Sequence, residues 1–246
     1  MTMTPRLITI AFSHYCEKAR WALDRADIDY VEDAHLPLFS YLPLVRAGAK
    51  RTAPALVTDD GTVLVDSTDI LRWCDAHGRA EPLFPPGDDE VVALEEEFDR
   101  HLGPATRRLG YFYLLKDKRA TLDVLAKHGP RWERVLGKAS RPLAAALLRR
   151  GLRIDPAGAE RSRAVIDRTF SEIGERLRDG RKYLCGDRLT AADLTFAALA
   201  APVLLPDQYS EYLPREELVP PAFREVADAY RATPAGEYGL RMYLER

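Results

Sequence analysis

The chain has 246 residues and a formal net charge of −2, which indicates one large or two small soluble domains and argues against nucleic acid as the main partner. No apolar run approaches the roughly 20 residues of a membrane-spanning helix, and the N-terminus lacks the features of a signal peptide. Its three cysteines, Cys16, Cys74 and Cys185, lie too far apart for a disulfide framework or a zinc site. We therefore expect a cytoplasmic protein without a metal.

The first third of the chain alternates between strand and helix patterns. Apolar β-rich runs and amphipathic runs follow one another in the order strand, helix, strand, helix, strand, strand, helix. The Asp-Gly step at 60–61 predicts a tight turn between the last two strands. The predicted elements are, in that order, 7–12, 15–26, 28–31, a distorted helix within 35–49, then 53–58, 63–65 and 68–77. We predict a small α/β domain over residues 1–80.

The rest of the chain reads as a linker followed by helices. Segment 81–89, EPLFPPGDD, holds three prolines and one glycine, which is typical of a linker. Thr190 with Asp193 three residues later resembles a capping box before a strongly apolar helix. The predicted helices are 90–115, 121–136, 141–152, 160–178, 190–204, 221–230 and 235–244. We predict an all-helical domain over residues 90–246.

Ser13 and Cys16 lie where the first predicted strand runs directly into the first predicted helix. The first N–H groups of a helix are unpaired, so such a junction binds anions and favours a thiolate. Ser13 is either a hydroxyl donor to a bound thiolate or simply the helix N-cap. Cys16 is either a nucleophile or a buried structural cysteine. The residues alone leave these alternatives open.

Four motifs, in this order and spacing, resemble those of the cytosolic glutathione S-transferases. Ser13-His14-Tyr15-Cys16 is similar to the glutaredoxin Cys-x-x-Cys, with serine in the first position. Residues 52–56, TAPAL, resemble the Val-Pro-x-Leu motif with its cis proline, and Asp66-Ser67 resembles the Glu-Ser pair. Residues 185–194 resemble the signature of the helical domain. The resemblance implies an α/β plus all-α fold, with a thioredoxin-like N-terminal domain and a C-terminal helical bundle.

The resemblance also implies where glutathione is activated and bound. It places the catalytic serine or cysteine of the family at Ser13, seven residues before Arg20, and a more buried cysteine at Cys16. A hydroxyl donor and a helix N-terminus lower the pKa of a thiol from its free value of about 8.5. The residues expected to contact glutathione are Lys50, Arg51, Ala53, Pro54, Asp66 and Ser67. A helix cap explains the Asp66-Ser67 pair equally, and a solvated basic pair explains residues 50–51.

The helical part offers a pocket for a second substrate and one markedly basic stretch. Tyr111 and Tyr113 are expected to line that pocket, although aromatic core packing explains the same cluster. The stretch 117–157 is longer than a compact helical domain needs, which indicates a divergent, bacterial-type branch of the family. The basic residues are Arg131, Arg134, Lys138, Arg141, Arg149, Arg150 and Arg153. A solvated face, anionic substrates and a membrane surface are the alternative explanations of this charge.

Three functions are compatible with this resemblance. The first is a detoxification-type glutathione transferase, which activates the glutathione thiol for attack on a small apolar electrophile and needs glutathione as co-substrate but no metal. The second is a thiol transferase or deglutathionylating reductase that depends on Cys16. The third is a binding or interaction protein of the same fold with little catalysis. The resemblance implies a homodimer, and a different low-molecular-weight thiol remains an alternative to glutathione.

Overall fold

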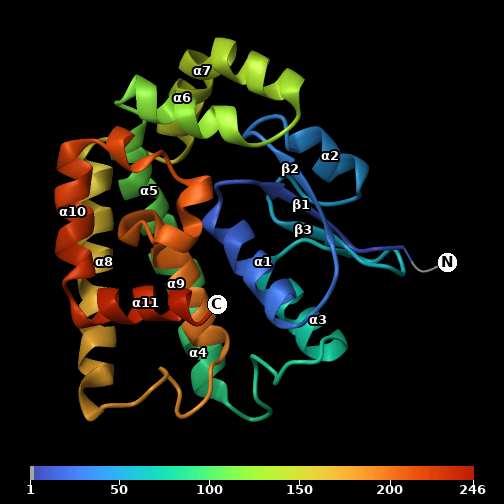
Figure 1. Ribbon diagram of the computed structural model, residues 1–246, viewed down its shortest axis with the longest axis vertical. Coiled ribbons are helices and arrows are strands. Elements are labelled where there is room, and N and C mark those ends of the chain that lie inside the picture. The colour runs from blue at the N-terminus through green and yellow to red at the C-terminus, as the bar shows by residue number, and fades with distance from the viewer. Residues whose placement is uncertain (1–2) are drawn as a thin grey trace.

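Two parts pack side by side in the computed structural model, which describes residues 3–246 (Figure 1). The N-terminal part contains a four-stranded sheet in the order β2-β1-β3-β4, and the remainder is helical. The predicted fold class, a thioredoxin-like part followed by an all-helical part, is therefore confirmed. The segment 78–88 between them has neither helix nor strand, and the division into domains at 1–80 and 90–246 stays a prediction.

In the N-terminal part, β1 is the central strand and helices cover both faces of the sheet. β1 runs parallel to β2 and antiparallel to β3, which in turn runs antiparallel to β4. Successive side chains of a strand point to opposite faces, so Leu7 joins the main core with α1 and α3, whereas Ile8 packs against Leu44 of α2. The elements are β1 Arg6–Ile10, α1 His14–Arg25, β2 Val31–His35, α2 Tyr41–Arg46, β3 Ala55–Val57, β4 Val63–Leu64 and α3 Ser67–His77.

The second strand lies later in the chain than the predicted 28–31. Its sequence, VEDAH, is polar because β2 is an edge strand whose side chains meet charged partners instead of an apolar layer. Glu32 accepts hydrogen bonds from the Thr9 hydroxyl at 2.6 Å and from Arg20 Nε at 2.9 Å. Asp33 accepts a hydrogen bond from Arg6 at 3.1 Å. Because these partners lie far away in the sequence, β2 lacks the alternation of apolar and polar residues on which a strand prediction depends.

Helix α9 forms the centre of the helical part. Every residue of α9 except Pro202 is buried, and the helix packs against α1, α5 and α11. The predicted capping box is confirmed: Asp193 accepts hydrogen bonds from the backbone N–H of Thr190 and of Leu184, both at 2.7 Å. No helix within residues 3–246 combines the length and apolarity needed to cross a bilayer. The helices are α4 Asp89–Glu97, α5 Gly103–Leu114, α6 Lys118–Lys127, α7 Arg131–Gly151, α8 Pro156–Arg176, α9 Ala191–Leu204, α10 Pro221–Arg231 and α11 Pro234–Leu244.

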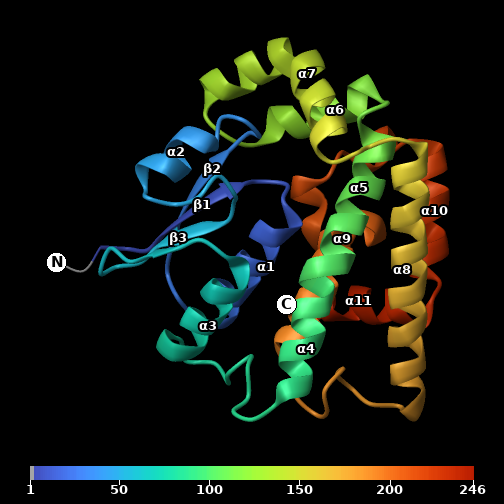
Figure 2. The same cartoon turned by 180° about the vertical axis from the view of Figure 1, so that it is seen from behind.

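Helices α6 and α7 lie across one end of both parts, and we call this helix pair the roof (Figures 1 and 2). The predicted break between the helices 121–136 and 141–152, at Gly137, is wrong, since α7 runs unbroken from Arg131 to Gly151. The chain turns instead at Gly129, whose φ of +85° ordinary residues rarely adopt, and at Pro130. Gly137 is a close-packing position, because a Cβ there would lie 2.7 Å from Leu36 Cδ1. The roof thus rests directly on the segment that follows β2.

Candidate functional site

A cavity of about 300 Å³ lies between the β1–α1 junction, helix α5 and the roof. Ser13 and Ala53 line it from the N-terminal part, Tyr111 from α5, and Leu148 from α7. Most of its lining side chains are apolar. The charged residues among them are all arginines, namely Arg51, Arg107 and Arg141. A cavity of this kind suits a mainly apolar molecule with a polar or anionic group.

Ser13 occupies the N-cap position of α1, but its hydroxyl does not cap the helix. Its backbone has φ −81° and ψ 123°, and its carbonyl accepts the hydrogen bond of Glu17 N at 2.9 Å. Its side chain makes no capping hydrogen bond. Because the residue lines the cavity, the hydroxyl is placed at a helix N-terminus without being used to close it.

Cys16 lies behind Ser13, fully buried in the core, and is not among the residues that line the cavity. Burial raises the pKa of its thiol to about 11, although the charge of Arg20 and hydrogen bonds with the Ile10 backbone and Ser13 act in the opposite direction. A thiol with such a pKa is protonated at neutral pH, and the protonated form is a poor nucleophile. The geometry therefore suits a structural cysteine.

His14 and Tyr15 are already bonded to the helical part. His14 Nε2 lies 2.9 Å from the Gly103 carbonyl and donates to it, and burial together with the Arg107 charge lowers the His14 pKa to about 3. The Tyr15 hydroxyl donates to the Asp99 carbonyl at 2.8 Å. Both side chains therefore fasten α1 to the junction of α4 and α5, which runs through the π-helical segment Phe98–Leu102, whereas the neighbouring Ser13 lines the cavity.

Of the residues expected to contact glutathione, Arg51 and Ala53 line the cavity together with Ser13. The Ala53–Pro54 peptide bond is cis, as in the motif that these residues resemble, and Ala53 lines the cavity. Arg51 also lines the cavity and lies over the Tyr41 ring at 5.0 Å, whereas Lys50 is exposed and does not line it.

Asp66 and Ser67 begin helix α3. Asp66 is its N-cap and accepts a hydrogen bond from Thr68 N at 2.8 Å, while Ser67 is the first helical residue and is buried. The cap interpretation of this pair therefore holds for Asp66. A capped N-terminus can still bind a carboxylate through its other unpaired N–H groups.

A second, acidic hollow adjoins the start of α3. It is lined by Asp66, Glu95 and Asp99, and Tyr15 borders both this hollow and the main cavity. The fully buried Lys18 ammonium donates to Asp99 at 2.8 Å and is also paired with Glu95. Glu96 adds a fourth carboxylate to the lining, whereas Arg72 and Arg100 add two cations. The four carboxylates exceed these arginines and Lys18 by one charge, so the hollow is suited to a ligand ammonium group.

The two tyrosines predicted for the second-substrate pocket separate in the structure. Tyr111 lines the cavity, whereas Tyr113 stacks on Phe223 at 5.1 Å between ring centroids, and its hydroxyl accepts a hydrogen bond from Arg163. Two residues apart on a helix means about 200° of rotation, so they face opposite sides. Arg107, one helical turn before Tyr111, lies on the same face of α5 and lines the cavity. Arg107 is missing from the predicted site, although its four-residue spacing from Tyr111 is a signal that the sequence contains.

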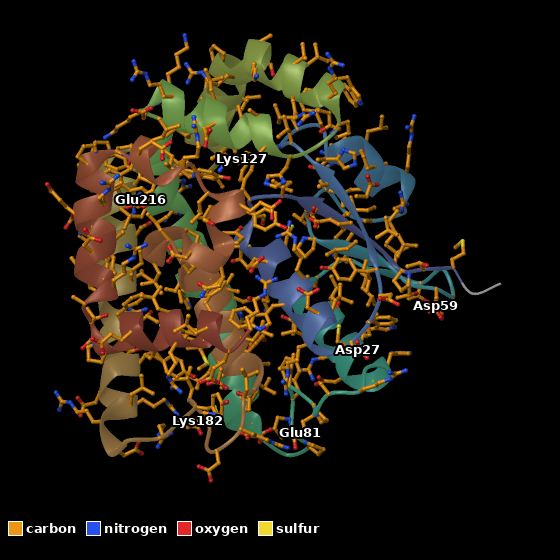
Figure 3. The ribbon with its side chains drawn as sticks, in the orientation of Figure 1. Asp27, Asp59, Glu81, Lys127, Lys182 and Glu216 are labelled. Atoms are coloured by element: carbon orange, nitrogen blue, oxygen red, sulfur yellow. The ribbon has the colours of Figure 1, made fainter. Side chains whose placement is uncertain are left out.

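Glu133 of α7 fastens the roof over the cavity. Its carboxylate is 1% exposed and accepts hydrogen bonds from Leu36 N at 2.9 Å and from His35 Nδ1 at 2.6 Å. At the other side, Lys127, labelled in Figure 3, donates to the Leu213 carbonyl at 2.6 Å. The roof is therefore attached to both parts of the molecule.

Comparisons with known proteins agree with this architecture. The family pattern described as the glutathione S-transferase N-terminal domain matches residues 7–82, and the one described as the C-terminal domain matches residues 156–232. No curated protein sequence matches the chain.

Two solved structures with a similar fold have low sequence identity to this chain. A glutathione S-transferase of Ceriporiopsis subvermispora in complex with glutathione is 18% identical, with a TM-score of 0.62 over 99% of this chain and 97% of that one. The beta-etherase LigF from Sphingobium sp. strain SYK-6 is 16% identical, with a TM-score of 0.58 over 98% and 100%. At these identities the likeness demonstrates a shared fold.

Proposed function

Because this chain belongs to the glutathione S-transferase superfamily, we propose that it activates the thiol of glutathione for attack on a small, mainly apolar electrophile. The observation that carries the proposal is Ser13, a residue that lines an apolar cavity at a helix N-terminus and whose hydroxyl does not cap that helix. A thiolate is the species that both features favour.

The charges around the junction suggest one orientation for glutathione. Its γ-glutamyl carboxylate binds the N-terminus of α3 at Ser67, and its ammonium lies towards the acidic hollow beside Asp66. The cysteinyl part lies against the backbone of Ala53 next to Pro54, and the glycyl carboxylate lies towards Arg51. Lys50, which is exposed, contributes only from the rim.

In this arrangement the thiol proton leaves to solvent, and the Ser13 hydroxyl keeps its own proton and donates a hydrogen bond to the resulting thiolate sulfur, which stabilises it. The sulfur electron pair forms the new bond to the electrophilic carbon, and the leaving group departs with the electrons of the broken bond. Tyr111 packs against the apolar body of the electrophile, and Arg107 balances negative charge that develops on it.

The burial of Cys16 favours this proposal over a Cys16-dependent thiol transferase. A reductase of that type needs an accessible thiolate, and this thiol is fully buried, does not line the cavity and is protonated at neutral pH.

The test compares Ser13→Ala with Cys16→Ala as the matched control. A charge-assisted hydrogen bond contributes about 1.5–3 kcal/mol, so its loss should raise the pKa of bound glutathione by about 1–2 units. We expect Ser13→Ala to bind glutathione but to shift the pH profile of kcat/KM upwards by that amount, and Cys16→Ala to keep the wild-type profile.

The outcomes separate the alternatives. An unchanged profile in Ser13→Ala would remove the proposed role of Ser13. Loss of thiol transfer in Cys16→Ala alone would favour the Cys16-dependent enzyme. No retention on immobilised glutathione would favour a binding protein or a different low-molecular-weight thiol.

A further inference from the structure

Exposed large apolar side chains gather at one end of the molecule. Within residues 3–246, the exposed large apolar residues outside this end are Met3, Val31 and Leu244. We call the clustered residues the apolar face: Leu38, Tyr41, Leu42 and Val45 around α2, with Trp132, Val135, Leu136, Leu143 and Leu147 on α7. Phe39 and Trp132 join the two sets through an edge-to-face ring contact at 5.4 Å. Soluble proteins usually scatter such residues singly, so a contiguous group marks an interaction surface.

Helix α7 is apolar on its outer side as well as on its inner side. Its buried residues, Glu133, Gly137 and Ala145, face the sheet and the cavity. The exposed apolar residues of α7 recur at helical intervals from Trp132 to Leu147, which places them along another side of the helix. That side has no covering partner among the described residues.

Basic residues far outnumber acidic ones in the two segments that carry this face. Within segments 36–53 and 131–153 the only acidic residue is Glu133, which is buried and bound to His35. The basic residues of these segments are Arg46, Lys50, Arg51, Arg131, Arg134, Lys138, Arg141, Arg149, Arg150 and Arg153. Arg51 and Arg141 line the cavity and Arg149 is bonded to the Leu115 carbonyl, so the other seven are the ones available to the face. The whole chain nevertheless carries a net charge of −2, so the positive charge is concentrated at this end.

We propose that the apolar face docks on an anionic membrane surface. Apolar side chains with flanking Lys and Arg on a helix that is too polar to cross a bilayer are the combination that binds the headgroup region. The charge also selects against a second copy of the chain, because a two-fold pairing of this face would oppose its own basic residues. Lipid phosphates complement these charges.

Docking would bring the cavity next to the lipid. The inner side of α7 lines the cavity through Ser140, Ala144 and Leu148, while its outer side carries Leu143 and Leu147. An apolar electrophile dissolved in the bilayer would then be concentrated within one helix diameter of the cavity. Docking itself does not depend on the proposed function, and its test needs no turnover.

The first test is co-sedimentation with vesicles. The full-length protein should bind phosphatidylglycerol–phosphatidylcholine vesicles, release them at high salt, and not bind pure phosphatidylcholine. Leu143→Asp/Leu147→Asp should abolish binding. Leu244→Asp, at a 75% exposed position on α11, is the matched control and should bind as the wild type does. Lys138→Gln/Arg150→Gln should weaken binding about 30-fold, since each cationic side chain near the surface contributes about fivefold.

A second measurement reports directly on the face. Trp132 is exposed, whereas Trp21 is buried and Trp73 is partly buried. Anionic vesicles should shift tryptophan emission to the blue, and brominated lipids should quench it. Trp132→Phe should remove both effects while leaving the circular dichroism spectrum unchanged.

Three results would overturn the proposal. The first is failure of the wild type to bind anionic vesicles at low salt. The second is equal binding by wild type and Leu143→Asp/Leu147→Asp when both are folded by circular dichroism. The third is a light-scattering mass that falls from dimer to monomer in this double variant, which would make the apolar face an interface between copies.

Discussion

Replacing Glu133 by alanine should release the roof from the sheet. The substitution removes the one carboxylate that accepts hydrogen bonds from Leu36 N and from His35 Nδ1. Neither His35 Nδ1 nor Leu36 N has another hydrogen-bond acceptor among the described residues. Both donors lie in a buried environment, and a buried donor without a partner is strongly unfavourable.

The magnitude follows from these two donors. Each donor costs about 1–3 kcal/mol when it is left unpaired. Glu133→Ala should therefore destabilise the closed roof relative to the open one by about 2–6 kcal/mol. The roof can open while α9 and the core stay folded, because few roof residues are buried. We therefore expect local opening rather than global unfolding, with at least about 30-fold faster amide exchange, since every 1.4 kcal/mol is tenfold.

Hydrogen exchange with mass spectrometry, resolved by peptide, measures this directly. Peptides from α6 and α7 should exchange faster in Glu133→Ala, while those from α9 keep wild-type protection. Glu160→Ala, at an exposed position on α8, is the matched control and should change neither. Unchanged protection of α7 in a folded Glu133→Ala protein would refute the reasoning that this carboxylate holds the roof.

Two further predictions concern stability. Asp193→Ala should lower the free energy of unfolding by about 2–6 kcal/mol in urea titrations, because the N–H groups of Leu184 and Thr190 lose their buried acceptor; an unchanged midpoint would contradict this. Burial raises the pKa of Glu32, but hydrogen bonds and charge from Arg20 outweigh it and hold the pKa below its ordinary 4.5. Its stabilisation is therefore present above pH 4.5 and lost as the pH falls through the lower, folded-state value, so the Tm difference between wild type and Glu32→Gln should shrink in acid.

Local signals in the sequence predicted the strand-to-helix junction at Ser13. The change from strand to helix around Ser13 depends on neighbouring residues only, and the structure has both elements there. The capping box at Thr190 was readable for the same reason, since its partner lies three residues away. Helical geometry alone also separates Tyr111 from Tyr113, because residues two apart on a helix face nearly opposite sides. The prediction of a single aromatic cluster did not take this rotation into account.

The features that were mispredicted depend on distant partners. The edge strand β2 satisfies His35 through Glu133, which lies 98 positions later in the chain. Gly137 resembles a helix breaker in isolation, yet it sits inside α7 because Leu36 approaches it closely. No pattern within a short window contains either partner, so the boundaries of β2 and of the roof helices could not be obtained from local periodicity.

The roof begins and ends at neighbouring points of the helical part. Leu115 before it and Ile154 after it belong to one small buried cluster, and Arg149 donates to the Leu115 carbonyl at 2.8 Å. The whole excursion also lies between the two stretches that match family patterns, 7–82 and 156–232. Such an insert is an exchangeable module: a segment of different length or polarity can be grafted between the same two anchors. The shape of the cavity would thereby change while the strand-to-helix junction at Ser13 stays as it is.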